Sequence, residues 1–332
     1  SDLDSLLPNV DTVIAGLSTK RAESGKIHDT NRRIFGNDPE GLFLADNVNY
    51  DVTASATYIL VSRKIFTAGY FYSGDLYIQD HSNWKKIFFL QLPADLTTYN
   101  AYKRAINMLA ATAAHEFQHM IHYWHKRSLT SQQYDANGWL DEAMSGYAEH
   151  INGFSVADRN NQSKATQVNN YFAAVNSTPI NQWFGNSADY GKVYLFGTWL
   201  AQNFGLNDSV SGLLDGSYYA DEAIRNFTGK SVDEVYARFL LAIAVNNYQD
   251  GGLYGIRALD LANEYSFDYG LANVELTGPA LNPINISLAN EVGEAVISTY
   301  AAAFIKIREG NGENVSITAT LPIGVSLFQL QK

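Results

Sequence analysis

Four histidines fall within eleven consecutive residues, in the segment HEFQHMIHYWH at 115–125. They are four of the seven histidines in the chain. The first five residues fit the pattern HExxH. On an α-helix this spacing places His115 and His119 on one face, where both can bind one zinc ion, with Glu116 beside them to activate water. The segment therefore predicts a catalytic zinc site in which Glu116 is the general base.

A catalytic zinc site generally has a third protein ligand and keeps one position open for water. His122 lies about 10 Å along the helix axis from His115, at 1.5 Å per residue, so it is excluded as a ligand of the same ion. His125 has the spacing of the third metzincin histidine, but that arrangement needs the chain to bend at position 122, where no helix-ending glycine stands. Glu142, in the segment WLDEAMSGYAE, offers a carboxylate from a second helix. We therefore predict Glu142 as the third ligand, with His125 as the alternative.

The surrounding sequence predicts the elements that must position these residues. Apolar side chains recur with a period of 3.6 residues over 98–127, which predicts a long helix that carries the histidine cluster. A polar loop is expected at 126–138, before the helix that carries Glu142. The other expected elements are an amphipathic helix at 1–21, strands at 57–61, 69–78 and 86–92, helices at 139–152, 191–203 and 210–247, and strands at 285–288, 295–307 and 314–330.

This order of elements predicts an α+β fold with two domains. The first covers 1–270, with a sheet and the active-site helix to about 150 and a helical part to about 265. The second is a small all-β domain at 275–332, where the predicted strands are separated by glycine-rich turns.

The composition of the chain argues against several classes of binding partner. With 332 residues and 46% apolar content the chain can bury a large core, and a net charge of −11 argues against nucleic acid. No apolar run approaches the roughly 20 residues of a membrane span. The first residues lack the pattern of a signal peptide, so we expect either a cytoplasmic protein or one whose leader has been removed.

Cysteine is absent, so any metal must be held by histidines and carboxylates. Acidic turns at 37–40 and 207–208 lack EF-hand spacing, which leaves calcium unsupported.

HEFQHMI followed by WLDEAMSGYAE resembles the hyicolysin family of bacterial zinc metallopeptidases, a gluzincin branch related in its catalytic core to thermolysin. Weaker similarity extends over about 65–247. The resemblance implies a two-lobed zincin with its cleft between the lobes, and a secreted or cell-surface enzyme. It also implies zinc on His115, His119 and Glu142, with Glu116 as the catalyst.

The resemblance further implies a tyrosine or histidine that stabilises the oxyanion. Tyr190, in the segment YGKVYLF, corresponds best to that tyrosine, and Tyr194 is second. The chain departs from thermolysin-like relatives at Gly146, where they carry an aspartate that supports the zinc site. Glu149 lies two turns beyond Glu142 on the same helix face. It is either an ordinary surface carboxylate or a residue that orients a ligating histidine.

Three functional hypotheses follow from these residues. The first is a zinc endopeptidase that acts on a protein or peptide substrate. The second is a catalytically silent binding protein that kept a protease fold, and the intact Glu116 argues against it. The third is a zinc enzyme that acts on another amide or on a glycoprotein, which the sequence leaves open, as it does the oligomeric state.

Overall fold

The computed structural model describes residues 27–39, 42–43, 49–51, 56–94, 96–279, 281–282, 301–302 and 304–305. Within these ranges helices predominate and the sheets are small, which is an α+β arrangement. The expected helix at 1–21 and the expected strands at 285–288 and 314–330 lie outside them. None of the helices in these ranges has the length and apolar character needed to cross a membrane.

A mixed three-stranded sheet packs against one side of the long helix α3 (Tyr99–Lys126). Its strands are β3 (Thr57–Ser62), β4 (Gly69–Phe71) and β5 (Lys86–Gln91), in the order β3-β5-β4. The central strand β5 is parallel to β3 and antiparallel to β4, so β4 is an edge strand. A two-stranded sheet of β1 (Leu42–Phe43) and β2 (Asn49–Asp51) precedes it.

The prediction of one strand over 69–78 was wrong. Strand β4 ends at Phe71 and is followed by a 3₁₀ turn, η1 (Ser73–Leu76). Serine, glycine and aspartate favour turns, and the Asp75 carboxylate accepts hydrogen bonds from the backbone N–H of Asn83 at 2.7 Å and from its side-chain amide at 2.9 Å. These bonds satisfy the turn locally and end the strand.

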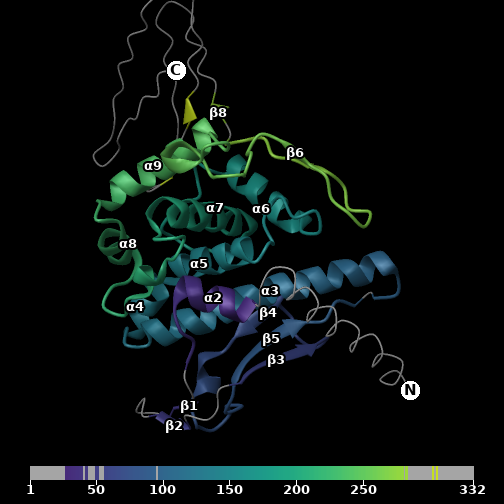
Figure 1. Cartoon of the computed structure of the whole chain (residues 1–332), viewed down its shortest axis with the longest axis vertical. Coiled ribbons are helices and arrows are strands. Elements are labelled where there is room, and N and C mark those ends of the chain that lie inside the picture. Colours follow the sequence, from purple (N-terminus) through teal and green to yellow (C-terminus); the bar gives the residue numbers. More distant parts are fainter. Residues whose placement is uncertain are drawn as a thin grey trace, which may run out of the picture.

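The long helix α3 (Tyr99–Lys126) forms as predicted and lies at the centre of the molecule. Its N-cap, Thr98, accepts a hydrogen bond from the N–H of Ala101, which satisfies one of the free donors of the first turn. Figure 1 shows the sheet and the short helix α2 (Ile27–Phe35) beside α3, and the remaining helices stacked beyond it. The apolar face of α3 joins the main hydrophobic core, which spans both sides of the helix.

The stretch predicted as a polar loop contains a helix. Helix α4 (Ser131–Ala136) begins with a capping box in which Thr130 and Gln133 exchange hydrogen bonds. It is polar and has no buried residue, so its sequence lacks the periodic apolar residues from which a helix can be predicted. Helix α5 (Gly138–Ile151) follows directly, close to the predicted bounds.

Four further helices complete the body: α6 (Gln162–Ala173), α7 (Ser187–Phe204), α8 (Ala220–Thr228) and α9 (Val232–Val245). The region predicted as helical over 210–247 is interrupted at Gly229, whose φ of 66° ends α8 in the left-handed conformation. Helix α7 starts earlier than predicted because Asn186 and Asp189 form a capping box. Short 3₁₀ turns, η2 (Ser211–Leu214) and η3 (Gly252–Tyr254), fill the connections.

The chain after α9 still packs on this body. Strands β6 (Glu264–Tyr265) and β7 (Val274–Glu275) form a hairpin, and Asn169 of α6 donates a hydrogen bond to the carbonyl of Glu275 at 2.6 Å. Leu276 is buried in the main core. The chain as far as Leu276 therefore packs on the helical body. Of the predicted β domain, the described strands are β8 (Leu281–Asn282) and β9 (Phe304–Ile305), which pair in parallel.

Helices α5 and α7 approach each other closely through glycines, and this gives a stability prediction. A Cβ on Gly197 would lie 2.3 Å from the backbone oxygen of Ala143, next to Glu142. We expect Gly197→Ala to destabilise the protein by about 1–3 kcal/mol, because the clash with backbone outweighs the roughly 1 kcal/mol gained in helix propensity. Urea unfolding measures the change. An unchanged or higher midpoint would contradict the packing described here.

Candidate metal centre

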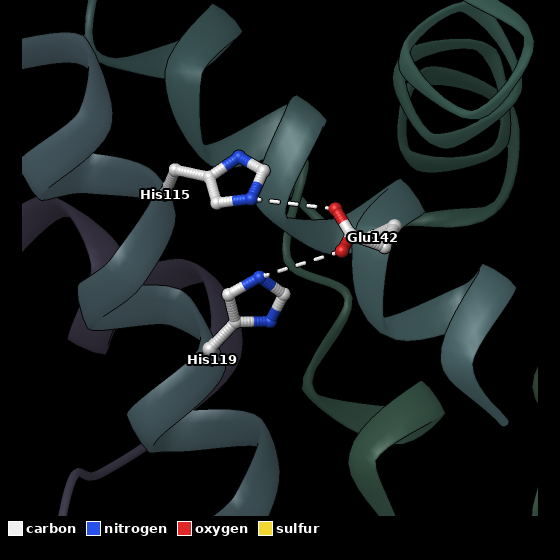
Figure 2. Close-up of side chains that lie close together, drawn as sticks. All are labelled: His115, His119 and Glu142. Carbon is white, nitrogen blue, oxygen red and sulfur yellow. Dashed lines mark ion pairs between the residues drawn. The ribbon is translucent and has the colours of Figure 1, made fainter. Parts of the chain in front are cut away.

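Helices α3 and α5 bring His115, His119 and Glu142 together (Figure 2). Nε2 of His115 lies 3.3 Å from Oε2 of Glu142, and Nε2 of His119 lies 3.9 Å from Oε1 of the same carboxylate. One ligand atom from each residue falls within 4.8 Å of the others. In the described part of the chain no other group of three or more histidines and carboxylates has this geometry. The arrangement is that of a three-ligand metal site.

The other nitrogen of each imidazole meets a carboxylate. Nδ1 of His115 is hydrogen bonded to Oε1 of Glu149 at 3.0 Å, and Nδ1 of His119 lies 2.9 Å from Oδ1 of Asp141. When the rings are neutral, as metal binding requires, a proton on each Nδ1 would face these carboxylates and leave each Nε2 free to bind an ion beside Glu142. Carboxylates in this position fix the orientation and the basicity of metal-binding histidines.

The charges around the site favour a bound cation. Burial opposes protonation of His115, but the nearby carboxylates of Glu142 and Glu149 outweigh it and raise the pKa of His115 well above its usual value. Burial likewise opposes protonation of His119, but Asp141 raises its pKa to about 9. Without a metal, the carboxylates therefore hold protons on both imidazoles. A divalent ion can take the place of that positive charge.

The donor set fits zinc. Two imidazole nitrogens and one carboxylate oxygen are ligands that zinc accepts in catalytic sites. Oε2 of Glu142 is buried without a hydrogen-bond donor, which a coordinated cation would satisfy. The side chains of the three ligands keep 12%, 16% and 17% of their surface exposed, so the site is open on one side. An open position is what distinguishes a catalytic zinc site from a structural one.

Glu116 lies beside the ligands and is 5% exposed. Burial raises the pKa of its carboxyl group, and the positive charges of His115 and His119 oppose that rise. Edge strand β4 packs directly on this residue: a Cβ on Gly69 would lie 3.0 Å from Cγ of Glu116. The carboxylate is thus held between the ligands and β4, with the raised pKa that suits a general base.

The two remaining histidines of the cluster do not join the metal ligands. Helix α3 continues without a break through His122 to Lys126. His122 is fully buried beside Asp141, and Nε2 of His125 lies 3.0 Å from the backbone oxygen of Asn37. The helix therefore lacks the bend that the metzincin alternative requires, and His125 faces the chain after α2.

The two tyrosine candidates lie in different surroundings. Burial raises the pKa of Tyr190, and the charges of Glu142, Glu116 and Glu149 add to that rise, so the phenol stays protonated. Tyr194 is fully buried, and its hydroxyl contacts Nδ1 of His150 at 3.0 Å. Tyr194 therefore belongs to the core between α5 and α7, and Tyr190 remains as the candidate.

The structure also accounts for Gly146. A Cβ there would lie 3.2 Å from Cα of Tyr194, so close packing of α5 on α7 favours glycine. Glu149, one turn later, supplies a carboxylate to His115 instead. Lys164 of α6 is buried and donates to the same Oε1 of Glu149 at 3.0 Å.

Sequence reasoning did not single out Asp141 or Lys164. Asp141 could have been found from its place next to Glu142. Nothing in the sequence points to Lys164, because its contact with Glu149 of α5 arises only when the two helices pack in the folded protein.

Comparison with known proteins gives one informative relationship. No family model matches the sequence. Over 215 residues the chain is 26% identical to a protein from Staphylococcus hyicus named neutral metalloprotease ShpI. The aligned region covers 60% of this chain and 47% of that protein, so the chain spans about half of its relative's length. The relationship supports a metallopeptidase ancestry and agrees with the histidine and glutamate cluster.

Proposed function

We propose that this protein is a zinc-dependent endopeptidase. The observation that carries the proposal is the convergence of Nε2 of His115, Nε2 of His119 and the carboxylate of Glu142, with Glu116 beside them. The relationship to a neutral metalloprotease supports the choice of peptide bonds as the substrate class. We further propose a hyicolysin-like enzyme of the gluzincin type, with α3 between the sheet and the helical part as in a two-lobed zincin.

When bound here, zinc would polarise a scissile carbonyl and lower the pKa of water at the open position towards neutrality. Glu116 would take the proton from the attacking water and pass it to the leaving amine. Glu149 and Asp141 would hold the two imidazoles with Nε2 turned inward. The partial exposure of the three side chains would give a peptide access, and edge strand β4 lies next to Glu116.

Tyr190 would donate its phenolic hydrogen bond to the carbonyl oxygen as negative charge develops there. We expect Tyr190→Phe to lower kcat about 100- to 1,000-fold with little change in KM, because the hydrogen bond is needed only in the transition state. Steady-state kinetics on a fluorogenic peptide measure both constants. If the substitution changed only KM, or neither constant, Tyr190 would have no role in stabilising the transition state.

Tyr194→Phe is the matched control for this measurement. It removes the same hydroxyl from the same helix, but at a buried position bonded to His150. We expect it to lower stability and to leave kcat per folded molecule near the wild-type value.

Cleavage of casein and of a peptide library by the zinc-loaded protein tests the proposed activity. A zinc enzyme that acts on another amide or on a glycoprotein would retain the metal without cleaving these substrates. We also propose that the protein acts outside the cell, as the resemblance to the hyicolysin family implies, and that 275–332 form an accessory β domain. Detection of the protein in culture supernatant tests its location.

A further inference from the structure

A row of buried polar groups leads from the start of helix α8 to the zinc ligand His119. The backbone N–H of Ala220 donates to Oδ1 of Asn137 at 2.8 Å, and Nδ2 of Asn137 lies 2.5 Å from Nε2 of His122. Nδ1 of His122 lies 3.3 Å from Oδ1 of Asp141, which is 2.9 Å from Nδ1 of His119. The row as a whole connects the start of α8 to the metal centre.

The contact at Ala220 determines which atoms donate and which accept along the row, because a backbone N–H can only donate a hydrogen bond. Oδ1 of Asn137 accepts that bond, so Asn137 presents its NH₂ group to His122. Nε2 of His122 must then accept. The single proton of the neutral ring is left on Nδ1, 3.3 Å from Oδ1 of Asp141, a contact that does not have hydrogen-bond geometry.

The surroundings of His122 agree with a neutral ring. Its side chain is fully buried, and burial lowers its pKa to about 4, with the charge of Asp141 opposing that shift. Ala220 holds a φ of 45°, a left-handed conformation that a residue other than glycine keeps only when its surroundings enforce it. The donor that starts the row is therefore held in place by the fold.

We infer that His122 is a positioning residue of the metal centre, held by Asn137 as the Nδ1-protonated tautomer so that Asp141 stays against His119. The inference rests on the proposed zinc site. The Ser145 hydroxyl also lies 3.1 Å from Nδ1 of His119, and the charge of Asp141 helps to raise the pKa of Tyr134. These groups support the same side chains but do not replace a donor on the His122 side of the carboxylate.

Two substitutions test the roles of Nδ1 and Nε2 of His122 separately. His122→Asn keeps an amide donor near the position of Nδ1, and His122→Gln reaches the position of Nε2 but loses the donor towards Asp141. We expect the asparagine variant to bind zinc almost as tightly as wild type. The glutamine variant should bind zinc about 10- to 100-fold more weakly, the usual effect of losing support behind a metal ligand. Competition with a chromophoric zinc chelator measures both affinities.

His150 provides the matched control for loss of a buried histidine. Burial also lowers its pKa to about 4, and its contacts are with Tyr194 and Tyr147. We expect His150→Gln to lower the urea midpoint and to leave zinc affinity unchanged. Equal zinc affinities for the two His122 variants, whether both fall or neither does, would overturn the inference.

The tautomer of His122 can be read without any substitution. Long-range ¹H–¹⁵N NMR of metal-free protein labelled at histidine should show an unprotonated Nε2 and a protonated Nδ1. In Asn137→Asp, an acceptor replaces the NH₂ donor, so Nε2 should become protonated. A protonated Nε2 in the wild type would contradict the inference. This result is independent of the zinc proposal, which fails separately if the wild type binds no zinc.

Discussion

Replacing Glu116 by glutamine is expected to reduce peptide hydrolysis about 100- to 10,000-fold while one zinc per chain is retained. The side chain is 5% exposed and packs against β4 beside both histidine ligands. Glutamine keeps the size of this buried group but cannot take up a proton. The loss should therefore fall on kcat and not on folding or on metal content. Kinetics on a fluorogenic peptide, together with elemental analysis of the same sample, measure both.

The matched control for Glu116→Gln is a change at another carboxylate of the same helices. Glu149→Gln keeps a hydrogen-bond acceptor for Nδ1 of His115 and alters support of the ligand without touching the proposed base. It should weaken zinc binding, yet remain active once zinc is saturating. Full activity of Glu116→Gln would show that another group takes the proton, and would contradict the mechanism proposed above.

Replacing Glu142 by alanine is expected to abolish stoichiometric zinc binding. Loss of support behind a ligand costs about 10- to 100-fold in metal affinity, and loss of a direct ligand should cost at least the upper end of that range. Among the residues that the structure describes, the variant removes the one carboxylate within 4 Å of both Nε2 atoms. Elemental analysis after dialysis against a weak chelator measures zinc per chain.

His125→Ala serves as the control for the Glu142 variant, since His125 is the alternative third ligand. Its Nε2 contacts the backbone of Asn37 in the structure, away from the other two histidines. It should keep one zinc per chain. Loss of zinc in His125→Ala, with retention in Glu142→Ala, would mean that α3 bends near His122 and that the third ligand is wrong.

The helices that carry the ligands could be predicted because their apolar residues repeat over long stretches. The predicted bounds of 98–127 and 139–152 differ by about one residue from those of α3 and α5. Helix α4 could not be found in this way, because it is short and has no buried face. Its readable signal was the capping pair Thr130 and Gln133. The strand at 69–78 was overextended because turn residues stand among its aromatic side chains.

The cluster of His115, His119 and Glu142 was predicted from the sequence, and Glu149 was named as a possible support for a histidine, but most residues behind the cluster could not be predicted. HExxH fixes two side chains on one helix face, and Glu142 follows at the start of the next apolar helix. The contacts of Glu149 with Lys164, and of His122 with Asn137, join elements whose relative positions only the fold determines. Sequence spacing excluded His122 as a ligand but gave no sign of its contact with Asp141.

The most direct test of the zinc site is an anomalous difference map, collected at the zinc absorption edge from crystals of the zinc-loaded protein. We expect one strong peak about 2.0–2.2 Å from Nε2 of His115, Nε2 of His119 and a carboxylate oxygen of Glu142. A peak that includes His125 in place of Glu142, or zinc-loaded crystals with no peak between α3 and α5, would contradict the account.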